Sequence, residues 1–349
     1  MMVTGLEVPW ALVFLPAQSG QLDNDALVTE RPGRVRLIQN WNLISQPVLT
    51  LNVVESPGTE RGLLGMALDP AFAENSLFYV YYTVSENGQD VNRIERYVLS
   101  ADHKSAKLDR IVLDGVPSGS IHDGGRLKFG PDGKLYLGTG DPTNYALAQD
   151  PKSLAGKILR LNSDGSTPSD NPIAGNPLYL LGVRNVEAFD WIGGGVMAIA
   201  EHGPTGELGE SGHDRVELTA GGDNFGWPTV YGCESGNGFA TPALSWNEAV
   251  PPGGGAYYTG NRIPEWTGSF LFGALEATHL HRVVFQTNPY GVVSHEVYFQ
   301  GDYGQGGGYG RLRDVVQGPD GYLYVTTSNC DGRGTCPSVQ DVILRIAHN

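Results

Sequence analysis

A short strand pattern that recurs six times along the chain constrains the fold more than any other feature. Each copy alternates β-branched or other apolar residues with polar ones, usually beside a basic residue, as in GRVRLI at 33–38. The copies are anchored at Val35, Ile94, Ile158, Val216, Val283 and Ile343, and successive anchors lie 59, 64, 58, 67 and 60 residues apart. Six strand-rich units of about 60 residues therefore fill the chain.

A second repeat supports this spacing. The turn GPDG at 130–133 returns at 318–321, which is 188 residues later and roughly three units along the chain. In such a turn, proline presets one dihedral angle, aspartate binds its own backbone and glycine tolerates positive φ. Each copy therefore predicts a tight β-hairpin.

Repeats of this length that are rich in strands and turns are typical of propeller blades. We therefore predict an all-β fold, a six-bladed β-propeller of four-stranded antiparallel blades, as a single domain over residues 1–349. Closure of the ring hides the sheet edges, and the apolar runs at 11–15 and 26–29 are expected to complete it against the C-terminal strand. A site is expected where loops converge at one mouth of the central channel.

Composition and charge exclude several classes of function. The chain has 49 glycines and 22 prolines among 349 residues, without a collagen-like period, and 40% hydrophobic residues provide a core. The formal net charge is −15 and no basic run is present, which argues against nucleic acid as a partner. No apolar run approaches the roughly 20 residues of a membrane span, so membrane insertion is not expected.

The three cysteines bear on the cellular compartment. Cys330 and Cys336 bracket a turn-rich loop and could close it as a disulfide, whereas a zinc site would need further ligands nearby. Cys233 is expected to be a buried thiol rather than a nucleophile. These features favour an exported protein, periplasmic or secreted, whose leader is absent from this chain, while a cytoplasmic location stays open.

The first GPDG hairpin has a histidine at its entry and an aspartate at its exit. Two antiparallel strands joined by so short a turn bring His122 and Asp141 close together. A carboxylate beside an imidazole fixes its tautomer and raises its basicity, which suits a general base. The alternative is a satisfied histidine at a strand end.

Two arginine clusters depart from plain strand and turn content. Arg184 and Asn185 follow an apolar strand and offer a guanidinium fork and an amide, although an arginine paired across a blade interface would look the same. Arg311 and Arg313 lie two apart on a predicted strand and so point to one face, where no compensating carboxylate is expected. That arrangement suits an anionic ligand.

Two further segments suggest a metal and a substrate contact. The backbone carbonyls of Gly203 and Pro204 are hard oxygen ligands suited to calcium, although Gly-Pro is also an ordinary turn. Glu60 lies in a polar segment just before a glycine-bounded apolar turn. A base, arginines for an anion and bare carbonyls for a hard cation together suggest an anionic cofactor held by calcium.

Seven motifs, taken in order, resemble the soluble quinoprotein glucose/sorbosone dehydrogenase family, and within it the aldose sugar dehydrogenases. They are HDGGRLKFGPDG (122–133), GTGD (138–141), SLAGKILRLN (153–162), GVRN (182–185), EHGP (201–204), NFGWP (224–228) and GRLRD (310–314). The resemblance runs from about residue 6 to residue 346. It implies pyrroloquinoline quinone (PQQ) and Ca²⁺ at the propeller mouth, an aldose substrate oxidised at C1 to its lactone, and a soluble or membrane electron acceptor.

The resemblance also implies roles for single residues. His122 would take the proton of the C1 hydroxyl while hydride passes to PQQ, and Asp141 would hold His122 in place. Arg184 would stabilise charge developing on the cofactor. The remaining implied contacts are Asn185, Arg311 and Arg313 to PQQ, the carbonyls of Gly203 and Pro204 to calcium, and Glu60 to the substrate.

Four positions depart from the family pattern. Many relatives carry a basic residue where this chain has Glu276, so either PQQ affinity is reduced or the local alignment differs. Relatives hold a second, structural calcium with a Glu and a Tyr where this chain has Arg215 and Phe225, so that site is predicted to be absent. Arg61 replaces a common glycine, so substrate access is expected to differ.

Two other functions remain as alternatives. A calcium-dependent propeller hydrolase of the lactonase type would need side-chain carboxylates and amides converging on the metal, whereas the arginine pair is better explained by an anionic cofactor. A non-catalytic sugar- or protein-binding propeller is the second alternative, and Glu276 gives it some weight.

Overall fold

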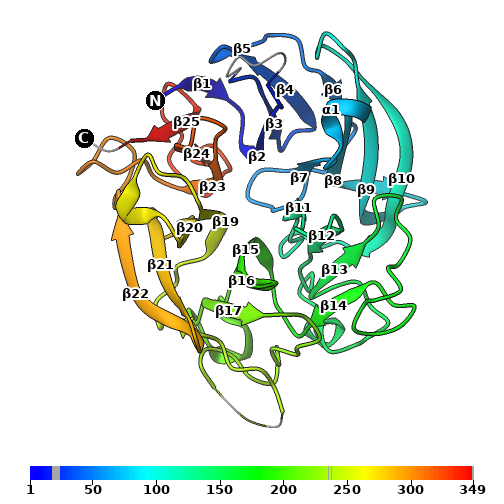
Figure 1. Cartoon of the computed structure of the whole chain (residues 1–349), viewed down its shortest axis with the longest axis vertical. Coiled ribbons are helices and arrows are strands. Elements are labelled where there is room, and N and C mark those ends of the chain that lie inside the picture. The colour runs from blue at the N-terminus through cyan, green and yellow to red at the C-terminus, as the bar shows by residue number, and fades with distance from the viewer. Residues whose placement is uncertain (18–23, 235, 237, 348–349) are drawn as a thin grey trace.

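The computed structural model describes residues 1–17, 24–234, 236 and 238–347. Six antiparallel sheets stand as blades around a central axis, in chain order from blue to red (Figure 1). The predicted all-β, six-bladed propeller is therefore confirmed. The short helices of the described residues are α1 (Phe72–Asn75), η1 (Tyr145–Ala148), η2 (Glu207–Gly209) and η3 (Pro264–Trp266).

The strands follow the chain blade by blade. Blade 1 contains β2 (Pro9–Phe14), β3 (Ala26–Glu30), β4 (Arg34–Gln39) and two short strands that both pair with β4, β5 (Asn42–Leu43) and β6 (Leu49–Thr50). Blade 2 contains β7 (Leu63–Leu68), β8 (Leu77–Glu86), β9 (Gln89–Leu99) and β10 (Ala106–Pro117). Blade 3 contains β11 (Leu127–Phe129), β12 (Leu135–Gly138), β13 (Lys157–Leu161) and β14 (Leu178–Leu181).

The second half of the ring repeats this plan. Blade 4 contains β15 (Val186–Gly193), β16 (Val196–Glu201), β17 (Arg215–Thr219) and β18 (Leu244–Ser245). Blade 5 contains β19 (Pro252–Tyr258), β20 (Ser269–Ala274), β21 (His279–Thr287) and β22 (Tyr290–Tyr298). Blade 6 contains β23 (Leu312–Gln317), β24 (Leu323–Thr327), β25 (Asp341–Ile346) and β1 (Val3–Leu6).

The sequence repeats mark equivalent strands in the six blades. The anchors lie on the third strand of each blade: Val35 on β4, Ile94 on β9, Ile158 on β13, Val216 on β17, Val283 on β21 and Ile343 on β25. The two GPDG turns join the first and second strands of blades 3 and 6. In each, the amide of the last glycine donates to the carbonyl of the first, at 2.9 and 3.0 Å. The sequence period therefore equals the blade period.

The ring is closed by the first strand of the chain. β1 pairs antiparallel with β25, with Val3 opposite Ile343 and Leu6 opposite Asp341, and so forms the outer strand of blade 6 (Figure 1). The runs at 11–15 and 26–29 also meet the C-terminal strand, as expected, but by packing rather than by strand pairing: Leu12, Ala26 and Val28 share an apolar cluster with Ile343 of β25. These runs fall in β2 and β3, the inner strands of blade 1, because their apolar side chains are buried on both faces between neighbouring blades.

Strands near the axis are buried on both faces, and this holds the channel rigid. All six residues of β16, VMAIAE, are buried, as are all six of β20. The outer strand β22, in contrast, has no buried residue. Apolar clusters lie between adjacent blades, as between β15 and β16 of blade 4 and β20 of blade 5. The mouth of the channel therefore rests on packed strands.

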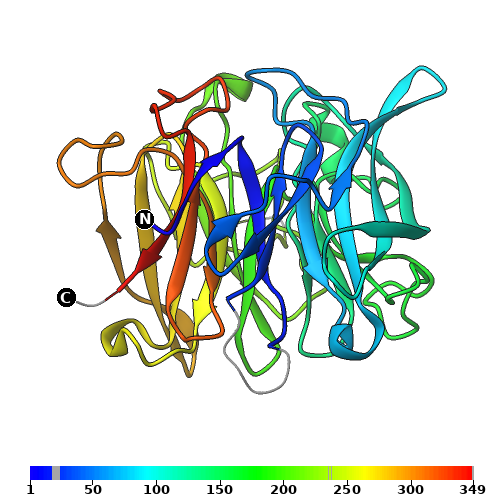
Figure 2. The same cartoon turned by 90° about the horizontal axis from the view of Figure 1, so that it is seen from above.

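The loops before the first strands and after the second strands gather on one face of the ring, the upper face in Figure 2. The predicted disulfide between Cys330 and Cys336 lies on this face and is confirmed, with the two Cα atoms 4.4 Å apart. Cys233 is an exposed free thiol, so the expectation of a buried one is wrong, because it lies in a surface connection after β17. Within the described part of the chain, no helix has the length and apolar character that crossing a bilayer requires.

Candidate functional site

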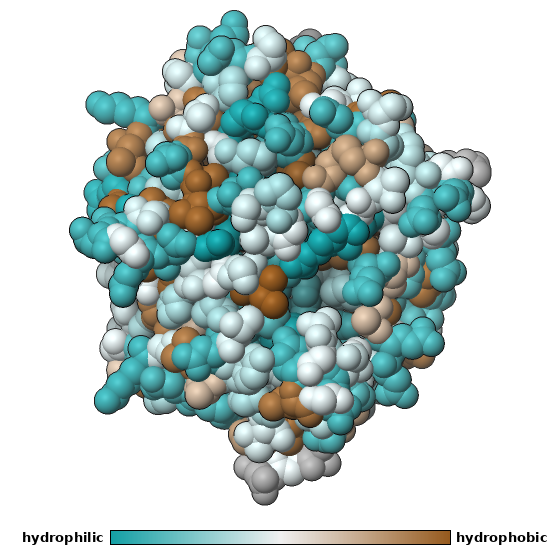
Figure 3. Space-filling view, turned by 180° about the vertical axis from the view of Figure 1, so that it is seen from behind, coloured by the Kyte–Doolittle hydropathy of each residue, from teal (hydrophilic) through white to brown (hydrophobic). Residues whose placement is uncertain are grey.

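A cavity of about 450 Å³ opens at the centre of this face. The space-filling view shows the hollow, with hydrophilic side chains gathered around it (Figure 3). Its lining comes from five of the six blades and consists of Glu60, Ile121, His122, Arg184, His202, Gly203, Thr205, Asp214, Ala249, Pro251, Leu275, Glu276, Arg311 and Arg333. The sequence predicts a site role or a disulfide for eleven residues. Five of them line the cavity: Glu60, His122, Arg184, Gly203 and Arg311.

The predicted pair of His122 and Asp141 meets at the wall of this cavity. His122 Nδ1 lies 2.6 Å from Asp141 Oδ1, and both side chains are buried. The other carboxylate oxygen of Asp141 accepts a hydrogen bond from the indole Nε1 of Trp227 at 2.7 Å. His122 has a left-handed backbone, with φ of 62°, which is uncommon for a residue with a Cβ. The pair therefore leaves Nε2 of the imidazole as the ring nitrogen that can take a proton.

Glu60 connects His122 to the disulfide-closed loop. One oxygen of Glu60 accepts a hydrogen bond from the backbone amide of His122 at 2.7 Å. The other accepts one from Nη1 of Arg333 at 2.8 Å. Burial works to raise the pKa of Glu60, but the charges of His122 and Arg333 outweigh it and lower the pKa to about 2. Glu60 is therefore a fixed anion at the cavity wall.

Arg184 is buried, and Thr205 and Glu207 hold its guanidinium. Its Nη2 donates to Thr205 Oγ1 at 2.8 Å and to Glu207 Oε1 at 2.6 Å. Its guanidinium also lies over the Trp227 ring, 5.7 Å from the centroid. Burial acts to raise the pKa of Glu207, but the Arg184 charge lowers it below its usual range. The same Glu207 oxygen lies 3.6 Å from Nε2 of His122, so one carboxylate faces both the base and the arginine.

Asn185 lies behind the cavity wall. Its Oδ1 accepts a hydrogen bond from the backbone amide of Gly124 at 2.9 Å, and its Nδ2 approaches His202 Nδ1 at 3.5 Å. His202 in turn lines the cavity, and its Nε2 lies 2.6 Å from the carbonyl of Pro252. Asn185 therefore fixes the loop that follows His122.

The two arginines of blade 6 are paired with carboxylates, so the expectation of an uncompensated pair is wrong. Arg311 binds Asp331 through Nη2 at 2.9 Å and Nε at 3.0 Å. Arg313 forms an ion pair with Glu187 of blade 4 and lies deeper in the channel. The sequence pattern did not indicate either partner, because Asp331 lies 20 residues after Arg311, beyond β23 and β24, and Glu187 is 126 residues from Arg313. Of the two arginines, only Arg311 lines the cavity.

Gly203 and Pro204 form a corner held by Asp214. The amide of Gly203 donates to Asp214 Oδ1 at 3.0 Å, and the amide of Val250 donates to Oδ2 at 2.7 Å. The carbonyl of Pro204 accepts a hydrogen bond from the Gly212 amide at 3.0 Å. In the described ranges, no cluster of three or more His, Cys, Asp or Glu side chains could hold a metal ion. A cation at this corner would therefore depend on backbone carbonyls and on the oxygens of a bound ligand.

Of the departing positions, Glu276 lies at the rim of the cavity and Arg61 does not. Glu276 is exposed and lines both this cavity and an adjoining one of about 330 Å³, which also share Leu275, Arg311 and Arg333. Arg61 turns away and binds Asp90, beyond β8, at 2.7 Å. Arg61 is not part of the cavity lining, so its effect on substrate access stays a prediction.

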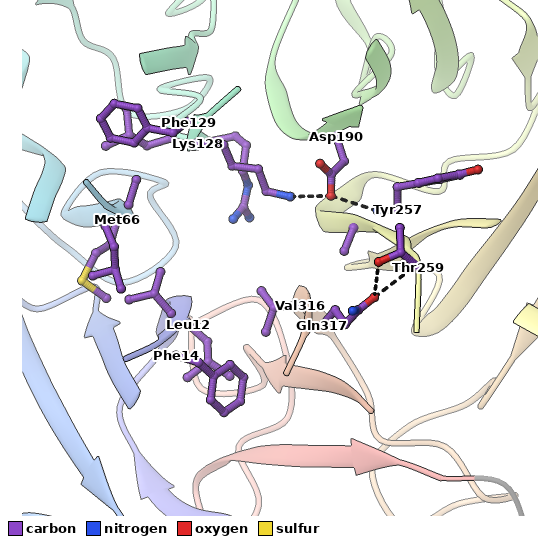
Figure 4. Close-up of a pocket in the computed structure, with 16 residues that line it drawn as sticks. Leu12, Phe14, Met66, Lys128, Phe129, Asp190, Tyr257, Thr259, Val316 and Gln317 are labelled. Carbon is purple, nitrogen blue, oxygen red and sulfur yellow. Dashed lines mark hydrogen bonds and ion pairs between the residues drawn. The ribbon is translucent and has the colours of Figure 1, made fainter. Parts of the chain in front are cut away.

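A second cavity, of about 480 Å³, lies at the other end of the channel and is lined by residues of the first strands of all six blades. Figure 4 shows Lys128 and Asp190 pointing toward one another across it, 3.1 Å apart. The charge of Lys128 is therefore already neutralised there. No residue predicted for the site lines this cavity among the described ranges.

Sequence reasoning missed four side chains that shape the site: Trp227, Glu207, Asp331 and Arg333. Trp227 stands in the motif NFGWP and could have been noted there. Asp331 and Arg333 stand between the two paired cysteines, which was a signal that this loop is fixed. Glu207 lies in the loop between Pro204 and Asp214, and nothing in its neighbourhood of the sequence points to Arg184.

The sequence matches one family model over most of its length. Residues 6–344 match the family described as Glucose / Sorbosone dehydrogenase. The chain is also similar to the aldose sugar dehydrogenase of Escherichia coli, with 30% identity over 351 residues that cover 94% of this chain and 89% of that protein.

Solved structures of similar proteins support the same family. A Thermus thermophilus protein described as an oxidoreductase (glucose dehydrogenase) is 40% identical, with a TM-score of 0.86, and 98% of this chain and 97% of that one are covered. The PQQ-bound aldose sugar dehydrogenase of Streptomyces coelicolor is 32% identical, with a TM-score of 0.84 and coverage of 99% and 95%. The similarity therefore extends through all six blades.

Proposed function

The chain belongs to the glucose/sorbosone dehydrogenase family of oxidoreductases, and on that basis we propose that it oxidises the C1 hydroxyl of aldose sugars to lactones with PQQ and calcium. The observation that carries the proposal is the His122–Asp141 pair at the wall of a cavity bordered by arginines. Relatives named as aldose sugar dehydrogenases, one of them PQQ-bound, support this substrate class and this cofactor.

The residues around the cavity fit an anionic cofactor. The guanidinium groups of Arg184, Arg311 and Arg333 border a volume of about 450 Å³, a size common for small-molecule sites. Within the described chain, the buried Nε of Arg184 has no hydrogen-bond partner, so a strong donor is left for a ligand. Arg184 and Arg311 would hold the cofactor directly. Asn185 would act from behind the cavity wall, through the loop that it fixes. Arg313 would act from a deeper position, through its charge.

Calcium fits the corner at Gly203 and Pro204. Backbone carbonyls are uncharged hard donors of the kind that calcium binds, and Gly203 borders the cavity. The Asp214 carboxylate, which holds the corner through two backbone amides, also lines the cavity and adds negative potential there. We assign Gly203 and Pro204 to calcium beside the cofactor.

The chain's own residues then divide the chemistry. When bound, PQQ accepts a hydride and calcium polarises it as a Lewis acid. Nε2 of His122 takes the hydroxyl proton while the C1 hydrogen leaves with its electron pair, so the C1–O bond becomes a carbonyl. Asp141 keeps the imidazole oriented, and general-base catalysis of this kind contributes roughly 10²–10⁴-fold. Arg184 stabilises the negative charge that develops beside it, and Glu60 faces the sugar.

Reconstitution tests this function. Purified protein is given PQQ and Ca²⁺, then a panel of aldoses, and bleaching of an artificial electron acceptor is followed. We expect turnover that depends on PQQ and is lost on chelation of calcium. His122→Ala should abolish turnover and keep PQQ binding, whereas His103→Ala, a histidine outside the cavity, should change neither.

Other results would redirect the assignment. Turnover with no aldose in the presence of PQQ would leave a binding propeller as the better description. Hydrolysis of a lactone without PQQ would favour the hydrolase alternative. Full activity of His122→Ala would refute the assignment of the base.

The disulfide between Cys330 and Cys336 bears on the cellular compartment in which the protein works. Disulfides persist in oxidising compartments and are rare in the cytosol. We therefore propose that the enzyme works in the periplasm or outside the cell, where a soluble or membrane electron acceptor reoxidises it. Reduced activity of protein made in a reducing cytosol, compared with exported protein, would support this location.

A further inference from the structure

Arg215 is a fully buried cation directly beneath the catalytic loops. It lies at the start of β17, and only 2% of its surface is exposed. Its Nε donates to Glu201 Oε1 at 2.5 Å, and its Nη2 also contacts that oxygen. Its Nη1 donates to the carbonyl of Phe225 at 3.2 Å, and Nη2 to the carbonyl of Gly182 at 3.5 Å. The guanidinium is thus surrounded by oxygen atoms.

A second buried carboxylate completes this shell. Glu217 Oε1 lies 2.8 Å from Nε of Arg215 but accepts no hydrogen bond from it, so the two groups are in close contact without a hydrogen bond. Burial and the neighbouring Glu201 charge raise the pKa of Glu217 well above its usual range. Two carboxyl groups and two backbone carbonyls therefore surround one side chain.

These four groups are the kind that a hard divalent cation binds. The sequence predicts that no structural calcium is bound at Arg215 and Phe225. In this chain the side chain of Arg215 fills the space between the oxygens, so the residues present do not fit a metal there. The positive charge is supplied by the protein itself.

The oxygens around Arg215 belong to the segments that build the site. Glu201 also accepts a hydrogen bond from the backbone amide of Arg184 at 2.9 Å through its other oxygen. Gly182 begins the segment that carries Arg184. Phe225 stands two residues before Trp227, whose indole holds Asp141. One guanidinium therefore joins the Arg184 segment to the segment that orients the catalytic pair.

We propose that Arg215 is a built-in substitute for a structural cation and acts as a positioning residue for Arg184 and the His122–Asp141 pair. Its removal leaves two carboxyl groups and two carbonyls that calcium can bind in its place. The stability part of this proposal stands without any assigned activity, whereas the kinetic part rests on the proposed function.

Thermal unfolding of the full chain without PQQ tests the substitution. In EDTA, Arg215→Ala should unfold about 5 °C or more below the wild type, because the two carboxyl groups and two carbonyls around Arg215 lose their cation. Millimolar CaCl₂ should recover at least half of that loss, and MgCl₂ should not, since Mg²⁺ needs a smaller octahedral shell. The matched control is Arg96→Ala, in which a buried arginine of a third strand leaves one carboxylate and one carbonyl. Calcium should not raise its Tm.

The kinetic arm uses Arg215→Lys, which keeps the charge and loses the planar fork. Its kcat should fall about 10²-fold with little change in KM, as expected when catalytic groups move by an ångström. A Tm of Arg215→Ala that calcium does not raise overturns the substitution. If Arg215→Ala does not fold with or without calcium, the kinetics of Arg215→Lys test the proposal. A wild-type kcat in Arg215→Lys overturns the positioning role. A lowered kcat with an unchanged Tm supports it. Should wild type itself turn over no sugar, the calcium result still stands.

Discussion

The guanidinium of Arg184 and the carboxylate of Glu207 lie 2.6 Å apart at the wall of the site cavity. The arginine is therefore not an empty anion site, because the chain places its own anion there. The same carboxylate oxygen reaches within 3.6 Å of His122 Nε2, where the sugar hydroxyl is proposed to bind. Both cofactor and substrate thus have to compete with Glu207.

Replacing Glu207 by Gln should tighten PQQ binding, because the internal competitor for Arg184 loses its charge. We expect the PQQ concentration for half-maximal activity to fall about tenfold, which corresponds to about 1.4 kcal/mol. Glu210→Gln, in the same loop but paired with His213, is the matched control. Weaker PQQ binding in Glu207→Gln would mean that Glu207 supports the cofactor instead.

Replacing Glu276 by Lys should also favour PQQ, through a different contact. Glu276 is exposed at the rim and faces a cavity that Arg311 and Arg333 line, so its charge offsets theirs. Reversing it should lower the half-saturating PQQ concentration about tenfold at low ionic strength, and by less at high salt, because exposed charges are screened. Glu74→Lys, on the exposed surface of α1, should have no effect. An unchanged half-saturating PQQ concentration would show that the charge of Glu276 does not affect cofactor binding.

Opening the disulfide ring should loosen substrate binding. The ring carries Asp331, which holds Arg311, and Arg333, which holds Glu60 and donates twice to the carbonyl of Gly58. We expect the double variant Cys330→Ser/Cys336→Ser to raise the KM for the sugar about tenfold. Cys233→Ser removes the exposed free thiol and should behave as wild type. Kinetics on both variants, with and without a reductant, distinguish the ring from a general thiol effect.

Asp123 should make stability depend on pH in the neutral range. Burial raises the pKa of Asp123 to about 7, although Asn92 and Ser118 donate hydrogen bonds to it. The folded state therefore keeps a proton that the unfolded state has lost above about pH 4, and the free energy of unfolding falls as pH rises from about 4 to 7.

Asp123→Asn removes this titration. It should be more stable than wild type at pH 8, by on the order of 3 kcal/mol, and equal to it near pH 4. Chemical denaturation at the two pH values measures the difference, with the exposed Asp302→Asn as control. A variant that is no more stable at pH 8 would show that the folded state accommodates the carboxylate.

The sequence predicts the parts of this molecule that rest on local patterns. The six anchors foretell the blades because each blade repeats one strand order, and the GPDG turn brings His122 to Asp141 because only 18 residues separate them in a hairpin. The partners of Arg313 and Arg184 were not predictable, because a ring brings together loops from separate blades. Arg313 meets Glu187 across the channel, at a distance in sequence that no pattern records.

The closure of the ring by β1 links the start of the chain to its end. In the part of the chain that the structure describes, residues 3–6 pair only with residues 341–343, so during synthesis this pairing cannot form until residue 343 has left the ribosome. Until then the outer edge of blade 6 is incomplete, and the first strand of the chain is unpaired. The topology therefore imposes an order of folding. Blades 1 to 5 can form as their strands emerge, whereas the closed mouth that holds the site forms only once the last strand has been made.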